Sequence, residues 1–455
     1  MAEDRPPPEE NRLSGRARRY ATVGGGVGGI AARLAGSRLL GREVNDAELA
    51  AELRAALGGM KGPIMKVAQM LATIPDALPE DYAMELAQLQ ANAPPMGWPF
   101  VKRRMTSELG AGWQGRFAGF EREAAAAASL GQVHRAELDD GRRVACKLQY
   151  PDMQSAVEAD LTQLDILFSI HRRMDRAIDT RQMAREIGAR LREELDYTLE
   201  RRHIDLYQAM LAADDTIAVP EPVPALSTGR LLTMTWLDGA PLLSFREAPL
   251  EVRNDIARAM FRAWWHPFSH YGVIHGDPHL GNYTVREDHG INLLDYGCIR
   301  KFPPAFVGGV VELYRGLQTG DRDRVVAAYE SWGFANLSND LVDILNIWAR
   351  FIYGPLLDDR VRTIADGISP GKYGRAEAGK VHAALKAHGP VTPPREFVFM
   401  DRAAIGLGGV FLHLAAELNF HDLFNAEIDG FETPVLEARQ AEALAAADLE
   451  MPADT

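Results

Sequence analysis

The sequence is poor in cysteine, has no surplus of basic residues and contains no long hydrophobic run. Its two cysteines, Cys146 and Cys298, exclude a disulfide scaffold and a four-cysteine zinc site, and they favour a reducing compartment. The net charge of −13 on 455 residues argues against general nucleic-acid binding, because phosphate repels an acidic chain. No stretch approaches the ~20 apolar residues that span a bilayer, and the first ten residues are acidic and proline-rich, unlike a secretory signal. We therefore expect a cytoplasmic, globular protein.

The charge is unevenly distributed along the chain. Residues 11–42 contain seven arginines and no acidic residue, which leaves −20 on the remainder. Arginines near a membrane attract anionic lipid by ~1 kcal/mol each, and the neighbouring Gly/Ala/Leu-rich sequence is compatible with peripheral binding. Two interpretations of this segment stay open: attachment to anionic membrane lipid at the inner face of the membrane, and a flexible basic arm without a ligand.

Composition and periodicity divide the chain into five parts. A flexible, basic and glycine-rich arm (1–42) precedes a helical extension (43–112). Strands dominate the next part (113–240), helices the following one (241–430), and the end is an acidic tail (431–455). Strands followed by helices indicate an α+β protein in two lobes.

The strand-rich part contains a clear hairpin. Residues 117–121 and 132–138 are predicted strands, Asp-Asp-Gly at 139–141 is a turn signal, and 143–149 is the returning strand. In that strand Val144, Cys146 and Leu148 should face one way, and Ala145 and Lys147 the other. A long helix should follow, because apolar residues recur every four positions from Met183 to Leu199.

The block at 274–300 carries the most chemical information. Asp277 is followed five residues later by Asn282, and Asp295 follows the apolar run 291–294 and precedes Tyr296-Gly297. A carboxylate and an amide oxygen suit a hard cation such as Mg²⁺. The spacing resembles the protein-kinase catalytic block, H-R-D-x-x-x-x-N followed by D-F-G. The resemblance implies that Asp277 is catalytic and that Asn282 and Asp295 bind metal.

A transition-metal site is the alternative interpretation of the same block. His275, Asp277 and His279 alternate, so on a strand they would share one face. Pro278 argues against a regular strand at this point.

The returning strand of the hairpin supplies a second kinase-like feature. Val144-Ala145-Cys146-Lys147 resembles the V-A-I-K strand of kinases, in which the lysine holds the nucleotide phosphates. Ala145 would then lie against adenine. Lys147 needs a carboxylate partner, and Glu200 is the predicted one. Asp196 lies four residues before Glu200, on the same face of the predicted helix.

Other candidate nucleotide contacts come from two segments. An alanine-rich segment stands where kinases have G-x-G-x-x-G, and alanine still lets a backbone come close to phosphates. Its candidate residues are Ala127, Ala128, Ser129, Gly131 and Gln132. The predicted hinge strand (231–237) would place Met234 near adenine and Trp236 near the hinge backbone.

Several motifs together resemble the UbiB (AarF-type) atypical kinases. They are S-L-G-Q-V-H-R-A at 129–136, Glu194-Leu195-Asp196 followed by Glu200, and H-G-D-P-H-x-G-N at 275–282. An N-terminal motif, Met65-Lys66-Val67-Ala68-Gln69-Met70, matches K-x-G-Q except for alanine at its third position. By this resemblance, Lys66 and Gln69 point into the nucleotide pocket, where they meet Glu194 and Asp196.

The resemblance implies a two-lobed protein-kinase-like fold whose active site is partly covered by the N-terminal extension. It implies an atypical kinase or ATPase that binds ATP (or ADP) and Mg²⁺ between the lobes. It also implies a role in ubiquinone biosynthesis or membrane lipid homeostasis, with quinone-biosynthesis proteins as partners. Two other functions stay open: a small-molecule phosphotransferase of the aminoglycoside or choline kinase type, which shares H-G-D-x-H-x-x-N, and a nucleotide-gated pseudokinase scaffold.

Overall fold

The computed structural model describes residues 96–128, 130–159, 161–162, 188–334, 337–365 and 395–451. The chain forms two compact units. The first comprises Met1–Arg201 and Pro222–Trp236, and the second comprises Arg202–Glu221 and Leu237–Thr455. The polypeptide therefore leaves the first unit at Arg202, returns to it at Pro222 for one strand, and leaves it again at Leu237.

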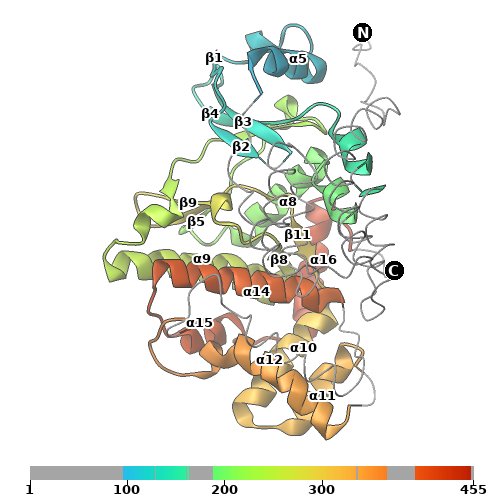
Figure 1. Cartoon of the computed structure of the whole chain (residues 1–455), viewed down its shortest axis with the longest axis vertical. Helices are drawn as coiled ribbons and strands as arrows, with labels where there is room; N and C mark the ends of the chain where they lie inside the picture. The colour runs from blue at the N-terminus through green and yellow to red at the C-terminus, as the bar shows by residue number, and fades with distance from the viewer. Residues whose placement is uncertain are drawn as a thin grey trace, which may run out of the picture. The chain divides into compact units, whose positions relative to one another are not determined.

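The first unit is built on an antiparallel sheet with the strand order β1-β3-β4-β6 (Figure 1). Strand β2 pairs with β3 on the edge that β1 also uses. The strands are β1 (Gly119–Phe120), β2 (Ala126–Ala128), β3 (Gly131–Glu137), β4 (Arg143–Gln149) and β6 (Leu231–Thr235). The expected return strand is thus observed with its predicted bounds, whereas the strand expected over 117–121 is shorter.

Strand β4 shows the predicted alternation. Val144, Cys146 and Leu148 belong to the hydrophobic cluster that also holds residues of helix α5 (Trp98–Leu109) and Trp113. Arg104 of α5 is buried, and its guanidinium donates to the backbone oxygens of Gln149 (3.1 Å) and Tyr150 (3.2 Å). The helix is therefore joined to the end of β4 by apolar packing and by hydrogen bonds to carbonyl groups that β4 leaves unpaired.

The continuous long helix expected over 183–200 is wrong. Residues 188–193 are helical, a turn follows, and helix α8 (Tyr197–Leu211) starts anew. The backbone oxygen of Leu195 accepts a hydrogen bond from Gln149 Nε2 (3.0 Å), and Tyr197 N donates to Gly229 O (3.2 Å). These partners from β4 and from the turn before β6 satisfy the backbone groups that the break releases.

The second unit has a four-stranded sheet, a strand pair and a largely helical remainder (Figure 1). The sheet has the order β5-β10-β9-β7, and β8 pairs with β11. The strands of the second unit are β5 (Ile217–Ala218), β7 (Ala240–Pro241), β8 (Val273–His275), β9 (Tyr283–Val285), β10 (Ile291–Leu293) and β11 (Ile299–Lys301). Its principal helices after α8 are α9 (Leu250–Tyr271), α10 (Pro304–Thr319), α11 (Arg322–Ser331), α12 (Asn339–Leu357), α14 (Arg395–Leu414), α15 (Phe420–Glu427) and α16 (Thr433–Ala446).

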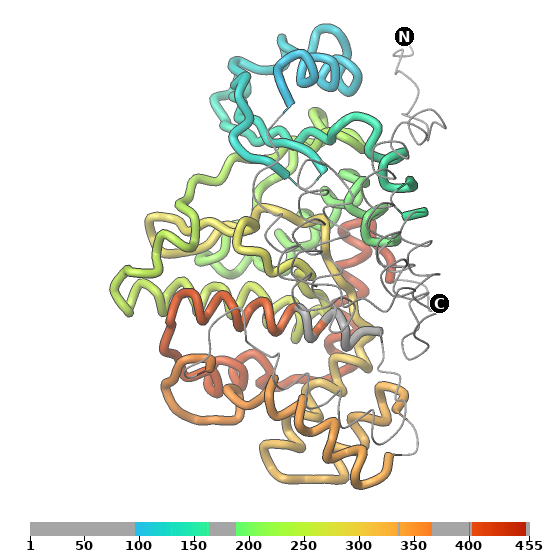
Figure 2. The backbone as a smooth tube through the Cα atoms, viewed as in Figure 1, coloured from blue at the N-terminus to red at the C-terminus, as the bar shows by residue number. Residues whose placement is uncertain are grey.

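Helix α9 is the centre of the second unit. Helices α14, α15 and α16, which come more than 120 residues later, all pack on it, and α14 runs alongside it in Figure 2. Aromatic rings form much of this contact: Phe261 stacks with Phe411 of α14, and Trp265 meets Phe424 of α15 edge to face. Gly272, in the left-handed conformation with φ of 62°, ends α9 and directs the chain into β8.

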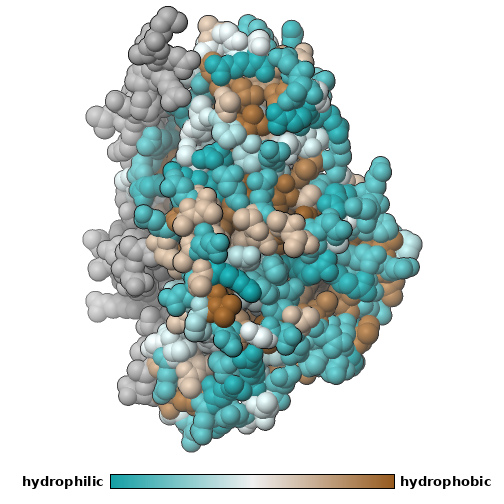
Figure 3. Space-filling view, turned by 180° about the vertical axis from the view of Figure 1, so that it is seen from behind, coloured by the Kyte–Doolittle hydropathy of each residue, from teal (hydrophilic) through white to brown (hydrophobic). Residues whose placement is uncertain are grey.

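Within the described ranges, no helix combines the length and hydrophobicity needed to cross a bilayer. On the face drawn in Figure 3, hydrophobic residues occur as small groups among hydrophilic ones. The large apolar side chains that are exposed come from separate parts of the described chain: Leu243, Leu250, Ile347, Val361, Val435 and Met451.

Candidate active site

The first functional feature is a buried ion pair in the first unit. Lys147 of β4 donates to Glu200 of α8, with 2.6 Å between Nζ and Oε1. The side chains are only 9% and 3% exposed, and Nζ lies 5.3 Å from the centre of the Tyr197 ring. The predicted pairing is therefore confirmed. A buried ion pair gains little for stability over apolar packing, so its presence favours a functional role.

The face of the sheet that carries Lys147 also carries the side chains of Ala145, Met234 and Arg135. Ala145 of β4 pairs directly with Met234 of β6, so both lie on one face, and both are 5% exposed. Arg135, which sequence reasoning missed, pairs with Ala145 on its other side. Its guanidinium lies 4.3 Å above the ring of Trp236. An arginine on a predicted strand has no local signal for such a contact, because its aromatic partner lies 101 positions away in the chain.

The alanine-rich segment is a strand and not a loop. Ala127 pairs with Gln132 and Ala128 with Gly131, so the segment forms a hairpin with β3. Ser129, which follows Ala128 in the sequence, lies outside the described residues. Gly131 is needed for close packing: a Cβ there would overlap the carbonyl oxygen of Leu148 and lie 3.0 Å from the Tyr197 hydroxyl.

The side chain of Gln132, a candidate nucleotide contact, binds the segment before α5. Gln132 is fully buried, and its amide oxygen accepts from Met96 N (2.7 Å) while its amide nitrogen donates to Met96 O (3.1 Å). The amide nitrogen also lies 2.9 Å from His134 Nε2. The side chain therefore ties the segment before α5 to the sheet, which leaves only the Gln132 backbone as a candidate contact.

The acidic residues Glu194 and Asp196 do not lie in a continuous helix with Glu200. Asp196 is exposed, and its Oδ1 accepts from Thr198 N (2.9 Å) and Leu199 N (3.2 Å). It is thus the N-cap of α8, a position that favours aspartate because free backbone N–H groups point to it. Glu194 lies in the turn before it and is half-buried. Lys66 and Gln69, their expected partners, lie outside the described residues.

In the second unit, His275 holds the predicted catalytic block together. Its Nε2 lies 2.6 Å from the backbone oxygen of Asp295, and its Nδ1 lies 3.3 Å from Asp277 N. With the proton on Nε2, one ring nitrogen donates and the other accepts. His275 is 2% exposed at the end of β8, and Gly276 N donates to Cys298 O (2.6 Å) beside it. The two aspartate segments are thereby joined through one buried imidazole.

Asn282 and the backbone around it complete the loop. Asn282 Nδ2 donates to the carbonyl oxygen of Asp277 (3.1 Å), and Leu294 N donates to Asn282 O (3.0 Å). Asp295 Oδ1 accepts from Gly297 N (2.9 Å). The amide nitrogen of Asn282 thus binds the Asp277 backbone, and its amide oxygen is the atom that could hold a cation.

The charges of both aspartates affect the buried hydroxyl of Tyr283. Burial raises the pKa of the Tyr283 hydroxyl well above its usual range, and the negative charges of Asp277 and then Asp295 raise it further. A hard cation suits such a pair of carboxylates together with an amide oxygen, so the residues present fit Mg²⁺.

The structure disfavours the transition-metal interpretation of this block. Both ring nitrogens of His275 are occupied, as described above, and β8 ends at His275, so the alternating residues do not share a strand face. His279 Nδ1 accepts from Gly281 N (3.1 Å). Among the described residues, the groups of side chains that could hold a metal through His, Cys, Asp or Glu lie elsewhere.

Two buried residues next to this block were not anticipated. His203 of α8 lies with Nδ1 3.0 Å from the backbone oxygen of Tyr296, and Tyr207, one turn later, packs edge to face against the Tyr296 ring. The four-residue spacing of these two residues on a helix was the available signal. They hold the segment after Asp295 from the side of α8.

The two cysteines are buried thiols in different surroundings. Cys146 faces the hydrophobic cluster, on the opposite side of β4 from Lys147, and burial raises its pKa to about 12. Cys298 lies next to Gly297 and is 9% exposed. The thiol of Cys146 therefore cannot contact a ligand on the Lys147 face of the sheet.

The sequence matches known proteins over this same region. Residues 88–329 match the model of the ABC1 atypical kinase-like domain, which is more than half of the chain. The chain is 30% identical to the mitochondrial atypical kinase COQ8 of Saccharomyces cerevisiae, over 54% of this chain and 50% of that protein. It is 27% identical to the mitochondrial atypical kinase COQ8B of Rattus norvegicus, over 80% of this chain and 69% of that protein.

A solved structure agrees with the sequence matches. The complex of Rv3197 with erythromycin from Mycobacterium tuberculosis has a TM-score of 0.59 and 26% identity, and the match covers 84% of this chain and 96% of that one. The likeness extends over both units, which confirms the expected two-lobed α+β fold. The chain therefore belongs to the ABC1 atypical kinase-like family, and its resemblance to the UbiB (AarF-type) kinases is confirmed.

Proposed function

We propose that this protein is an atypical kinase or ATPase that binds Mg-ATP. The observation that carries the proposal is the buried Lys147–Glu200 pair with 2.6 Å between its charged atoms, in a chain of the ABC1 family. Breaking a buried ion pair costs ~3–5 kcal/mol, whereas apolar replacements are often as stable, so stability alone does not require the pair. A lysine held in one position by a carboxylate is suited to bind the phosphates of a nucleotide.

Asn282, Asp295 and Asp277 of the second unit are the proposed metal ligands and catalytic base. Asn282 and Asp295 would hold Mg²⁺, and the ion, when bound, neutralises charge on the nucleotide phosphates. Asp277 would orient the attacking hydroxyl or water and accept its proton. His275 keeps the backbones of Asp277 and Asp295 at a set separation, so it is a positioning residue. In this proposal the Asp277 carboxylate acts on the nucleophile, and the Lys147 ammonium binds the phosphates.

The biological role proposed here rests on the relatives. The yeast and rat relatives are named as mitochondrial COQ8-type atypical kinases. We propose that this chain supports ubiquinone biosynthesis or membrane lipid homeostasis, with quinone-biosynthesis proteins as partners. Peripheral attachment through the arginines of residues 11–42 to anionic lipid belongs to the same proposal, although that segment lies outside the described residues.

Nucleotide binding and hydrolysis by purified variants test the proposal. Asp295→Ala and Lys147→Met should each abolish hydrolysis and weaken Mg-ATP binding. Asp288→Asn is the matched control, because Asp288 is a carboxylate of the same loop-and-strand block that is 65% exposed and pairs with Arg286. A wild-type chain that neither binds nor hydrolyses ATP contradicts the proposal, as does full activity in Asp295→Ala.

Hydrolysis and phosphate-transfer measurements also separate this proposal from a small-molecule phosphotransferase and from a nucleotide-gated scaffold. Adding anionic liposomes and isoprenoid-quinone precursors should raise hydrolysis if the proposed role is right. Rapid transfer of phosphate to a small alcohol would instead favour a small-molecule phosphotransferase. An Asp277→Asn variant that binds ATP, lacks hydrolysis and still complements a deletion strain would favour a nucleotide-gated scaffold.

A further inference from the structure

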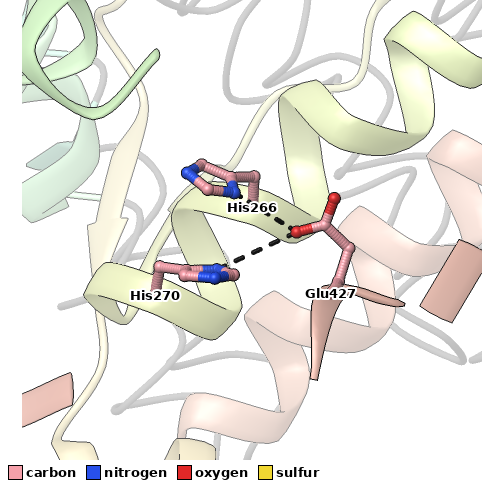
Figure 4. Close-up of side chains that lie close together, drawn as sticks. All are labelled: His266, His270 and Glu427. Atoms are coloured by element: carbon pink, nitrogen blue, oxygen red, sulfur yellow. Dashed lines mark hydrogen bonds and ion pairs between the residues drawn. The ribbon is translucent and has the colours of Figure 1, made fainter. Parts of the chain in front are cut away.

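A second group of chemically active side chains lies at the end of α9, apart from the Asp277 loop. His266 and His270 are four residues apart on this helix and therefore project from the same side. Glu427, the last residue of α15, faces both imidazoles (Figure 4). Its Oε2 lies 3.3 Å from His266 Nδ1 and 3.8 Å from His270 Nδ1. One ligand atom from each residue lies within 4.8 Å of the other two.

These separations are close to those of a tetrahedral metal site. With metal–ligand bonds of about 2.0–2.1 Å, two ligand atoms at tetrahedral positions are about 3.3 Å apart. The His266–Glu427 separation already has this value, and the other pairs need to close by up to 1.5 Å. The imidazole rings stack with 4.2 Å between their centres, so closing these separations requires the His270 side chain to rotate.

The side chains around His270 permit this rotation. Ser269 Oγ lies 2.8 Å from His270 Nδ1, but its hydroxyl also lies 2.7 Å from Trp265 O and can keep that acceptor when the imidazole turns. Helices α9 and α15 are held together by aromatic rings next to the cluster, including the Trp265–Phe424 contact at 4.7 Å. Two of the three ligands thus come from one helix and the third from a helix already packed against it.

We propose that His266, His270 and Glu427 bind a divalent transition-metal ion, with Zn²⁺ as the expected occupant. Two imidazole nitrogens and one carboxylate oxygen are a donor set that suits zinc, whereas Mg²⁺ prefers oxygen ligands alone. The side chains are 35%, 25% and 11% exposed, so water can reach a fourth position. His266 also borders an open cavity of about 390 Å³ that Asp214, Asp215 and Arg262 line as well.

The site would link α15 to the C-terminal end of α9. His270 is two residues from Gly272, where α9 ends, and β8 and the Asp277 loop follow directly. A bound ion therefore ties the start of the candidate catalytic loop to a helix that lies about 150 residues later in the chain. Folding and metal binding are coupled in such a link, because the ligands come together only in the folded chain.

A second cluster offers a comparison within the same unit. Asp359, His421 and Asp422 also lie within metal-ligand distance of one another, but both aspartates are exposed at 68% and only one imidazole is present. Exposed carboxylates are strongly hydrated and mobile, so this cluster should hold Zn²⁺ more weakly. His421 is therefore a suitable control residue: a histidine beside carboxylates that does not belong to the proposed site.

The experiment is zinc binding by the full chain, without an affinity tag and after removal of metals with a chelator. Titration calorimetry with Zn²⁺, and the visible absorption of Co²⁺ as a substitute, should show one tight site per chain. Glu427→Gln and His266→Ala should each lose this site, and His421→Ala should retain it. Circular dichroism identifies any variant that fails to fold, and Glu427→Gln nearly preserves the shape of the side chain.

A second readout is thermal stability with and without Zn²⁺. The wild-type chain and His421→Ala should gain in melting temperature on adding Zn²⁺, and Glu427→Gln should not. Absence of a tight site in the folded wild-type chain overturns the proposal. So does an unchanged stoichiometry in both Glu427→Gln and His266→Ala. Neither result depends on ATP binding, so the proposed kinase function and the metal site can fail separately.

Discussion

Lys147 shows how a single residue combines a structural cost with a chemical purpose. Its position on β4 is set by the alternation of the strand, which places Cys146 and Leu148 in the core and Lys147 on the other face. An ammonium group so deeply buried needs a nearby carboxylate, and Glu200 supplies it at 2.6 Å. The pair should therefore behave as one unit when either member is changed.

Removing one member of the pair should destabilise the first unit more than removing both. Lys147→Met or Glu200→Gln alone should cost about 3–5 kcal/mol, because each leaves a buried charge without its partner. The double variant should cost less than either single variant, as measured by urea unfolding in a double-mutant cycle. Asp140→Ala, which breaks an exposed pair with Arg142 in the same sheet, is the control and should have no measurable effect. Additive costs would show that the two charges are not coupled.

Gly131 is a position where neighbouring atoms leave no room for a side chain. A methyl group there would overlap the Leu148 carbonyl oxygen, so Gly131→Ala must push β3 and β4 apart. We expect a loss of about 3 kcal/mol in unfolding free energy, at the upper end of overpacking costs. Gly115→Ala is the matched control, because nothing lies within 4 Å of an added Cβ there. Equal stability of the two variants in thermal unfolding would be inconsistent with the close approach.

At the scale of the element, the start of α8 determines where Glu200 lies. The helix begins one residue after Asp196, and Glu200 is in its first turn, where a carboxylate also interacts favourably with the helix dipole. Asp196 accepts two backbone hydrogen bonds from this turn. The orientation of the Lys147 partner therefore depends on a helix cap and not on a continuous helix.

Replacing the cap distinguishes the structural role of Asp196 from the expected nucleotide contact. Asp196→Ala should lower stability by about 0.5–2 kcal/mol, and Asp196→Asn should restore most of it because asparagine is an equally good cap. If Asp196 acts only as a cap, Asp196→Asn should also bind Mg-ATP normally in a fluorescence or calorimetric titration. Normal stability with weakened nucleotide binding would instead support the carboxylate contact that the UbiB resemblance implies.

At the scale of the whole molecule, the two cysteines mark the two units. Cys146 belongs to the first unit and Cys298 to the second, and the sequence contains no other cysteine. Both thiols are buried in the folded chain. Each thiol therefore reports on the opening of its own unit.

Thiol labelling should be slow in the native protein and complete in urea. Burial raises the pKa of Cys146 to about 12, so at pH 8 only about one molecule in 10⁴ carries the reactive thiolate, and access is blocked as well. Cys146→Ser isolates the signal of Cys298, and Cys298→Ser isolates that of Cys146. Rapid labelling of native Cys298→Ser by an aromatic disulfide reagent would contradict the burial of Cys146.

Local patterns were enough to predict several elements and part of the candidate site. The alternation from Val144 to Leu148 and the Asp-Asp-Gly turn predicted β4 and its hairpin, because both signals depend on neighbouring residues only. The kinase-like spacing of Asp277, Asn282 and Asp295 identified the loop-and-strand block that carries them. The choice of Glu200 as the partner of Lys147 is confirmed across 53 positions of separation.

Other features could not be predicted, because their cause is distant in the chain. The apolar repeat continues through the break before α8, and the backbone groups freed there are satisfied by Gln149 and Gly229. Gln132 is occupied by the backbone of Met96, 36 positions away. Nothing near Gln132 in the sequence distinguishes this role from a contact with nucleotide.

The sequence by itself determined the family, the α+β class and the identity of the charged groups, since these depend on residue types at short spacings. Only the tertiary structure decided which of those groups meet. It showed His275 as the buried link between Asp277 and Asp295, and it brought Glu427 to two histidines more than 150 positions earlier. The physical reason is that a helix or strand follows from local backbone preferences, whereas the partner of a buried polar group is whichever element packs against it.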